Sequence, residues 1–377
     1  MGTMLELPGG ELLRWMGVML IGILGSWEYL KKNTPFKVFP YQYSLLLFPA
    51  MFSFFHDSNI ASIGIMRSAS FFFLIYALSS YYSREKVTRE YIESHFTIFS
   101  TFLVGVMSLQ GTFLLMNLNE FGFFKGIYNN KNYFTSIGIV ALICTIWLII
   151  RNEKYKILYK MYFLLITVLL VATGSRTALI GIVIVILSLP IIFFEQTKAG
   201  GKLKIILVML LILGFSAIAI QYIEIPALTR LLSEKSIDGS TGFSRSGWWY
   251  NAIPIFQKKP LFGWGNSAVY YHITNLNEGE LWGFHNSYLV ILVENGIIGS
   301  LFYLFFFVVS IYKTGVLYYK SNLKKHEKKL IKLMVLICMF LMINAFAEAF
   351  LFAVGNPMSV SFWLILIMLE RYLSLTN

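Results

Sequence analysis

Long apolar runs recur along the whole chain and are separated by short polar segments. A bilayer core about 30 Å thick requires about 20 apolar residues per helix, and the chain divides into about eleven runs of suitable length. The predicted spans lie near residues 12–30, 38–55, 60–82, 95–117, 133–150, 158–173, 177–194, 203–222, 285–312, 330–350 and 357–373. The pattern therefore predicts an all-α, polytopic membrane protein with ten to twelve spans, forming one transmembrane domain over residues 1–377.

Composition supports this fold class, because 57% of the residues are hydrophobic and 13% are charged. A soluble domain carries about 25% charged residues, so a soluble enzyme with one apolar tail is excluded. The net charge of +12 raises the question of nucleic acid binding. Most basic residues, however, fall in alternate loops of a membrane protein, which predicts no nucleic acid partner.

The distribution of basic residues predicts the orientation. Twenty-one of the 31 lysines and arginines lie on one side, in the loops around 31–37, 84–89, 151–160, 198–204 and 313–332, or at Arg371. Eight lie in the opposite loops. Since basic loops face the cytoplasm, the C-terminus is expected inside and the N-terminus outside.

The loop over residues 223–284 is much longer than the usual connection between packed helices. Its aromatic residues argue against disorder. We expect it to lie outside and to act as a lid, with a short amphipathic helix over Ser246–Phe256 lying on the membrane face.

Arg176 lies at the predicted outer tip of the hairpin formed by spans 158–173 and 177–194. Ser175 is a suitable N-cap for the second of these helices. A helix N-terminus together with a guanidinium is suited to bind phosphate. An arginine that extends to the membrane interface explains the same position equally well.

Arg245 precedes the predicted loop helix and lies four residues before Trp249. It is a second candidate cation on the outer side, where positive charges are few. A cation–π contact with Trp249 is an equally good explanation.

His285 opens the ninth predicted span and shares a helix face with Leu289, Leu292, Gly296 and Gly299. The glycine pair predicts close approach of another helix. Histidine changes its charge near neutral pH and can act as a general base, although spacing alone favours an interfacial hydrogen-bonding role.

Asn344 and Glu348 lie four residues apart near the outer end of the tenth predicted span. Glu348 is a candidate to brace one of the arginines, and a merely solvated carboxylate at a helix end is the alternative. The pattern contains no phosphate-binding glycine loop, zinc cluster or Ser-His-Asp arrangement, so no metal or other cofactor is predicted. The residues thus predict an outward-facing site for an anionic, lipid-anchored substrate.

Three motifs in this region resemble the bacterial O-antigen polymerase and ligase family. One is His285-Asn286-Ser287-Tyr288-Leu289 followed by Glu294-Asn295-Gly296. The others are Gly174-Ser175-Arg176-Thr177-Ala178, and Ser244-Arg245 with Trp249 before Pro260-Leu261-Phe262-Gly263-Trp264-Gly265. Together they cover residues 170–300.

The resemblance implies a GT-C-like membrane glycosyltransferase of the bacterial inner membrane that acts on undecaprenyl-diphosphate-linked oligosaccharides at the outer leaflet, without a metal. Arg176 and Arg245 would bind the donor diphosphate and His285 would be the general base, supported by Asn286, Glu348, Ser175 and Trp249. The resemblance favours a polymerase of the Wzy type, for O-antigen, capsule or exopolysaccharide, over a WaaL-type ligase. It also leaves room for a chain-length regulator protein as a partner.

A flippase or similar transporter of lipid-linked oligosaccharides is the alternative from another class. Such a protein is expected to place charged residues deep in many spans. The interior charges are few here, Arg14, Arg67 and Glu294 among them. This distribution favours an enzyme.

Overall fold

The computed structural model describes residues 58–84, 86–116, 124–128, 131–193, 245–266, 284–353 and 356–375, with a few positions between 20 and 47. Residues 58–63 and 245–251 are described by their backbone alone. Apart from those few positions, the predicted spans 12–30 and 38–55 lie outside the described residues, as do the span 203–222 and most of the 223–284 loop.

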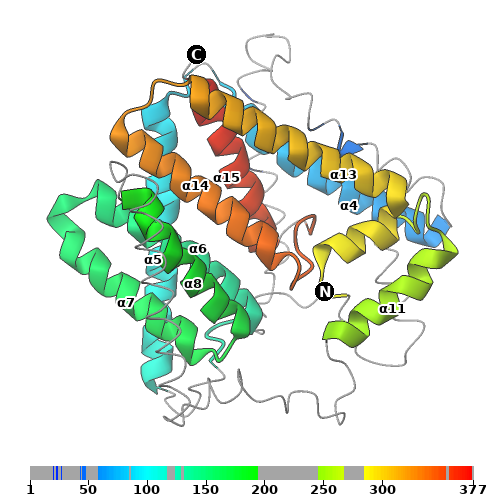
Figure 1. Ribbon diagram of the computed structural model, residues 1–377, viewed down its shortest axis with the longest axis horizontal. Helices are drawn as coiled ribbons and strands as arrows, with labels where there is room; N and C mark the ends of the chain where they lie inside the picture. The colour runs from blue at the N-terminus through cyan, green and yellow to red at the C-terminus, as the bar shows by residue number, and fades with distance from the viewer. Residues whose placement is uncertain are drawn as a thin grey trace.

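Every regular element in the described ranges is a helix (Figure 1). The helices are α4 (Ser58–Tyr82), α5 (Arg89–Met116), α6 (Lys131–Arg151), α7 (Lys156–Ala172), α8 (Arg176–Phe193), α11 (Arg245–Lys258), α13 (Ser287–Lys320), α14 (Lys325–Asn344) and α15 (Pro357–Ser374). Five helical segments among the described residues are long and apolar enough to cross a membrane, namely α5, α6, α8, α13 and the segment Glu153–Ala172. For this part of the chain the prediction of an all-α polytopic membrane protein is confirmed, whereas the number of eleven spans stays a prediction.

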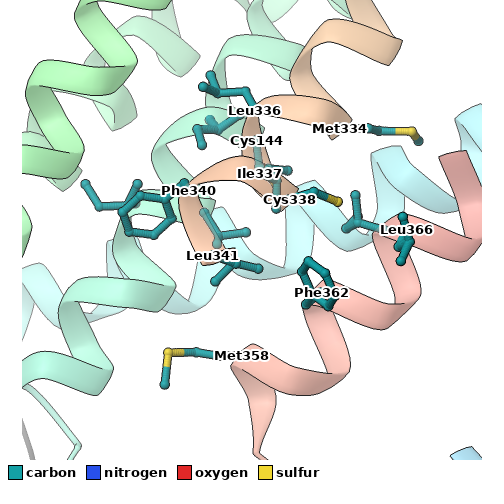
Figure 2. Close-up of a cluster of buried hydrophobic side chains, with 14 of the residues drawn as sticks. Cys144, Met334, Leu336, Ile337, Cys338, Phe340, Leu341, Met358, Phe362 and Leu366 are labelled. Carbon is teal, nitrogen blue, oxygen red and sulfur yellow. The ribbon is translucent and has the colours of Figure 1, made fainter. Parts of the chain in front are cut away.

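Helix α6 lies at the centre of the described bundle and packs against α5, α7, α8 and α14. It is apolar on all sides, and its residues from Phe134 to Leu148 are all buried. A helix that is hydrophobic all round requires such a position. Figure 2 shows part of this core, where Phe340 of α14 points away from α15 and Phe362 of α15 lies on the other side of α14.

Helix α13 is interrupted at Gly296, whose φ of 64° and ψ of −171° are not helical. The apolar pattern continues through this position and predicted one unbroken helix, which is wrong. The sequence also predicted that another helix packs closely at Gly296, but the segment that lies against it is a loop. The backbone around Leu261 occupies the space where a Cβ of Gly296 would lie, so the predicted helix–helix contact is a helix–loop contact.

The end of the bundle away from Gly296 holds a polar cluster around Glu93 of α5. The Glu93 carboxylate is buried and accepts a hydrogen bond of 2.7 Å from the Tyr372 hydroxyl of α15. Arg151 of α6 lies 3.7 Å from the same carboxylate, and His326 of α14 lies 3.5 Å from it. Four helices therefore meet at one charge, as a buried carboxylate requires.

Glu327 lies in the first turn of α14, before the predicted span 330–350, and adds a second ion pair to this end. Its carboxylate accepts a 2.9 Å hydrogen bond from the Arg89 guanidinium and another of 2.5 Å from the Lys324 backbone N–H. Burial acts to raise the pKa of Glu327, but these hydrogen bonds and the charge of Arg89 lower it below its ordinary value. Glu327 is therefore held in its charged form.

Candidate functional site

The segment before α13 meets the segment after α14, and Figure 1 shows the two helix ends side by side. The Ser287 backbone N–H donates to the Ala345 carbonyl over 2.8 Å. The Ser287 hydroxyl donates to the Glu348 carbonyl over 2.8 Å and accepts from the Phe350 N–H over 3.0 Å. Ser287, which is buried, thus fixes the position of the chain that carries Glu348.

Asn286 explains why α13 begins at Ser287. Its backbone is extended, and its side-chain oxygen accepts from the N–H groups of Tyr288 over 2.9 Å and Leu289 over 3.1 Å. These two contacts satisfy donors that the first helical turn leaves without partners. Asn286 therefore fixes the backbone next to His285, the residue that precedes it.

His285 lies just before this cap, so it does not open the helix as the sequence predicted. Its φ of 46° is in the left-handed region, where it is the one non-glycine residue among those described. Histidine enters this region more often than most residues, but at some cost in free energy. Such backbone strain often occurs at functional positions, which makes His285 a stronger candidate than its spacing alone did.

Glu348 lies against His285. Its carboxylate oxygen Oε2 is 3.4 Å from the His285 ring nitrogen Nδ1. The other oxygen, Oε1, accepts a 2.8 Å hydrogen bond from the Asn132 side-chain amide at the start of α6. The Glu348 side chain is 3% exposed, compared with 27% for that of His285, so a buried carboxylate supports a partly accessible imidazole.

The polar contacts continue from Asn132 to the start of α8. The Ser175 hydroxyl lies 3.5 Å from the Asn132 side-chain oxygen, and its carbonyl accepts from the N–H groups of Ala178 and Leu179. Ser175 therefore directly precedes α8, as the sequence predicted. Arg176 is the first residue of α8 and is exposed, at the positive end of the helix dipole.

Two members of this cluster were not predicted in these roles. Glu348 was expected to brace one of the arginines, which stays a prediction, and its contacts with His285 and Asn132 were not expected. Asn132 was not a predicted site residue at all. The one signal for it was the polar run Asn129-Asn130-Lys131-Asn132 directly before an apolar span.

The predicted loop helix is present as α11, which begins one residue earlier and ends two residues later than expected. Ala252 and Ile255 of α11 form a small apolar cluster with Phe284 and Val293. Arg245 begins this helix, so its backbone is tied to the residues on either side of His285. The side chains of Arg245 and Trp249 lie outside those described, and the position of α11 on the membrane face stays a prediction.

One region of sequence similarity contains most of the α7–α8 hairpin, α11, the 260–265 segment and the first half of α13. Residues 161–304 match the family model of the O-antigen ligases. The match spans the three motifs on which the resemblance rests, and it supports a membrane protein of the O-antigen ligase and polymerase type. No curated protein sequence matches the chain at a significant level.

His285 lies within the region matched to the O-antigen ligases. The carboxylate of Glu348, which contacts it, and the amide of Asn132, which contacts Glu348, lie outside that region. An imidazole held by a carboxylate is an arrangement suited to take a proton from a hydroxyl group. No group of three or more His, Cys, Asp or Glu side chains that could hold a metal occurs among the described residues. That a metal is not needed stays a prediction.

Proposed function

We propose that this protein is a membrane glycosyltransferase that polymerises undecaprenyl-diphosphate-linked oligosaccharide repeat units at the outer leaflet of the bacterial cytoplasmic membrane. The observation that carries the proposal is the contact between His285 and the buried Glu348. Asn132 contacts both Glu348 and Ser175, and Ser175 directly precedes Arg176. A proton acceptor and a candidate phosphate-binding cation thus belong to one polar cluster.

In the proposed reaction, a sugar hydroxyl of the acceptor attacks the anomeric carbon of the donor. The bond from that carbon to the diphosphate oxygen breaks, and the lipid diphosphate leaves with the bonding electrons. Arg176 and Arg245 bind the diphosphate and stabilise its growing negative charge. His285 takes the hydroxyl proton on its Nε2 atom, while Glu348 at Nδ1 stabilises the resulting imidazolium.

The loop over residues 223–284 would close over the bound donor as a lid, and it carries α11 with Arg245. Closure excludes water, which strengthens the interaction of the guanidinium groups with the diphosphate. Water is also a competing acceptor, and its exclusion directs transfer to the sugar hydroxyl.

A ligase that transfers the glycan to a lipid A core would use the same groups, because the donor and the leaving group are unchanged. A flippase of lipid-linked oligosaccharides is the alternative from another class. A chain-length regulator would be a partner of the polymerase alone. These possibilities differ in their products, so one reconstitution separates them.

The test uses the purified protein in liposomes with a lipid-linked repeat unit. A ladder of glycan lengths is expected. A single transfer to an added lipid A core would identify a ligase instead, and movement of the substrate across the bilayer without new bonds would identify a transporter.

Arg176→Ala and Arg245→Ala should each lower transfer about 10²–10³-fold, because each removes a group that stabilises the leaving diphosphate. Arg-to-Lys variants should recover little, since an ammonium cannot form the bidentate contact. Lys154→Ala is the matched control, because Lys154 is an exposed cation just before α7. Full transfer in either arginine variant would remove that residue from the proposed site.

A further inference from the structure

The break in α13 removes two hydrogen bonds that a regular helix would contain. In an unbroken helix the N–H groups of Ile297 and Ile298 would donate to the carbonyls of Val293 and Glu294. A backbone group without a partner is costly at membrane depth, because no water replaces the lost bond. All four of these groups must therefore find partners elsewhere.

The segment 260–265 supplies all four partners. The Val293 carbonyl accepts from the Trp264 N–H over 3.0 Å, and the Glu294 carbonyl accepts from the Gly265 N–H over 2.7 Å. In the other direction, the Ile297 N–H donates to the Pro260 carbonyl over 2.8 Å, and the Ile298 N–H donates to the Leu261 carbonyl over 3.1 Å. The loop thus replaces the helical bonds that the break removes.

Two glycines permit this contact. Gly263 has a φ of 70° and Gly296 has a φ of 64°. A Cβ on Gly263 would overlap the backbone of Glu294, and one on Gly296 would overlap the backbone of Leu261. The obstructing atoms are backbone atoms, so a side-chain rotation cannot relieve the overlap.

The same segment is fixed to α11. The Trp264 indole N–H donates to the Ile255 carbonyl over 2.8 Å. The Lys259 ammonium lies 4.3 Å from the centre of the Trp264 ring. At its far end the segment is also fixed to α4, because the Asn266 amide donates to the Ser68 hydroxyl over 2.6 Å.

We propose that residues 260–266, here called the clamp, position α11 against the first half of α13 for the transfer reaction. Gly263, Trp264 and Gly296 are then positioning residues, which act through Arg245 at the start of α11 and His285 before α13. This inference rests on the proposed function, because it assumes that Arg245 binds the donor and that His285 activates the acceptor. The clamp gives a structural reason for the motif Pro260–Gly265 and the motif that ends at Gly296 to occur together, because the backbones of the two motifs bond to each other.

Hydrogen exchange of the protein in lipid nanodiscs tests the clamp without any substrate. The amides of Trp264, Gly265, Ile297 and Ile298 should exchange slowly in the wild type and faster in Gly263→Ala and Gly296→Ala. Gly315→Ala is the matched control on α13, because no atom lies within 4 Å of its Cβ position. Rapid exchange of these amides in the wild type would overturn the clamp.

Kinetics test the positioning role, with Trp264→Phe as the mild variant. It retains the backbone bonds and loses the indole donor to Ile255, so the protein should still fold. We expect the donor KM to rise about tenfold and kcat to fall by a smaller factor, since Arg245 on α11 both binds the donor and stabilises the leaving diphosphate, while His285 is unchanged. An unchanged donor KM in Trp264→Phe and in Gly263→Ala, with exchange increased in Gly263→Ala, would overturn the positioning role. Absence of transfer in the wild type would instead contradict the proposed function and leave the exchange result standing.

Discussion

At the scale of single residues, the candidate site depends on where one strained histidine is held. His285 adopts a left-handed backbone conformation, and Asn286 and Ser287 fix the chain on its C-terminal side. Glu348 then defines which ring nitrogen faces the protein. A carboxylate in this position orients an imidazole and stabilises its protonated form, so it contributes to catalysis through the histidine.

This coupling predicts the outcome of a double-mutant cycle in the reconstituted enzyme. His285→Ala should lower kcat about 10²–10⁴-fold. Glu348→Gln should lower it by a similar factor, because the amide can still accept from Asn132 but cannot stabilise an imidazolium. The double variant should be little worse than His285→Ala alone, since the two residues act as a unit.

Glu153→Gln is the control for the cycle, because Glu153 is an exposed carboxylate paired with Lys156 before α7. Additive losses in the cycle, or normal turnover in a folded His285→Gln variant, would contradict the assignment of His285 as the base.

At the scale of elements, α6, α7 and α8 pack closely because glycines remove side chains from their contacts. The Cβ position of Gly181 on α8 lies 2.6 Å from Ile139 of α6 and 3.0 Å from Phe340 of α14. The Cβ position of Gly138 on α6 lies 2.7 Å from Leu170 of α7. Small residues at helix contacts are the usual way to obtain tight packing in membranes, where the hydrophobic effect does not drive helices together.

Gly181→Ala should therefore lower the thermal stability of the protein in detergent. Overpacking a core costs about 1–3 kcal/mol, which exceeds the gain of up to about 1 kcal/mol in helix propensity from glycine to alanine. Gly315→Ala should show that gain alone, because its Cβ position is open. A melting temperature for Gly181→Ala equal to or above that of Gly315→Ala would show that the contact with Ile139 and Phe340 relaxes.

The sequence predicted elements better than their interruptions and contacts. Hydropathy predicted α4 to α8 and α13 to α15, because each long helix must fill the bilayer with apolar side chains. It could not predict the break at Gly296, since the apolar pattern is the same on both sides and the replacement bonds come from a loop about 30 residues away. Likewise, no periodicity connects His285 with Glu348, which lies in the segment after α14, or with Asn132 of α6.

At the scale of the whole molecule, the described bundle has two chemically different ends. One end holds His285, Glu348 and Asn132, with Arg176 at the start of α8. The other holds the ion pairs of Glu93 and Glu327 with Arg151 and Arg89. Because the acidic groups of the second end are used in these pairs, its many lysines leave a strongly positive surface, which is typical of the cytoplasmic side.

The two ends lead to a prediction of orientation that single cysteines test in intact cells. Both native cysteines, Cys144 and Cys338, are buried, so the wild type should give little background with a membrane-impermeant maleimide. Lys125→Cys introduces an exposed thiol at the end of the candidate site, and Lys325→Cys introduces one at the basic end. Lys125→Cys should react from outside, whereas Lys325→Cys should react after the membrane is permeabilised. Reaction of Lys325→Cys first would place His285 on the cytoplasmic side, and an enzyme that acts at the outer leaflet would then be impossible.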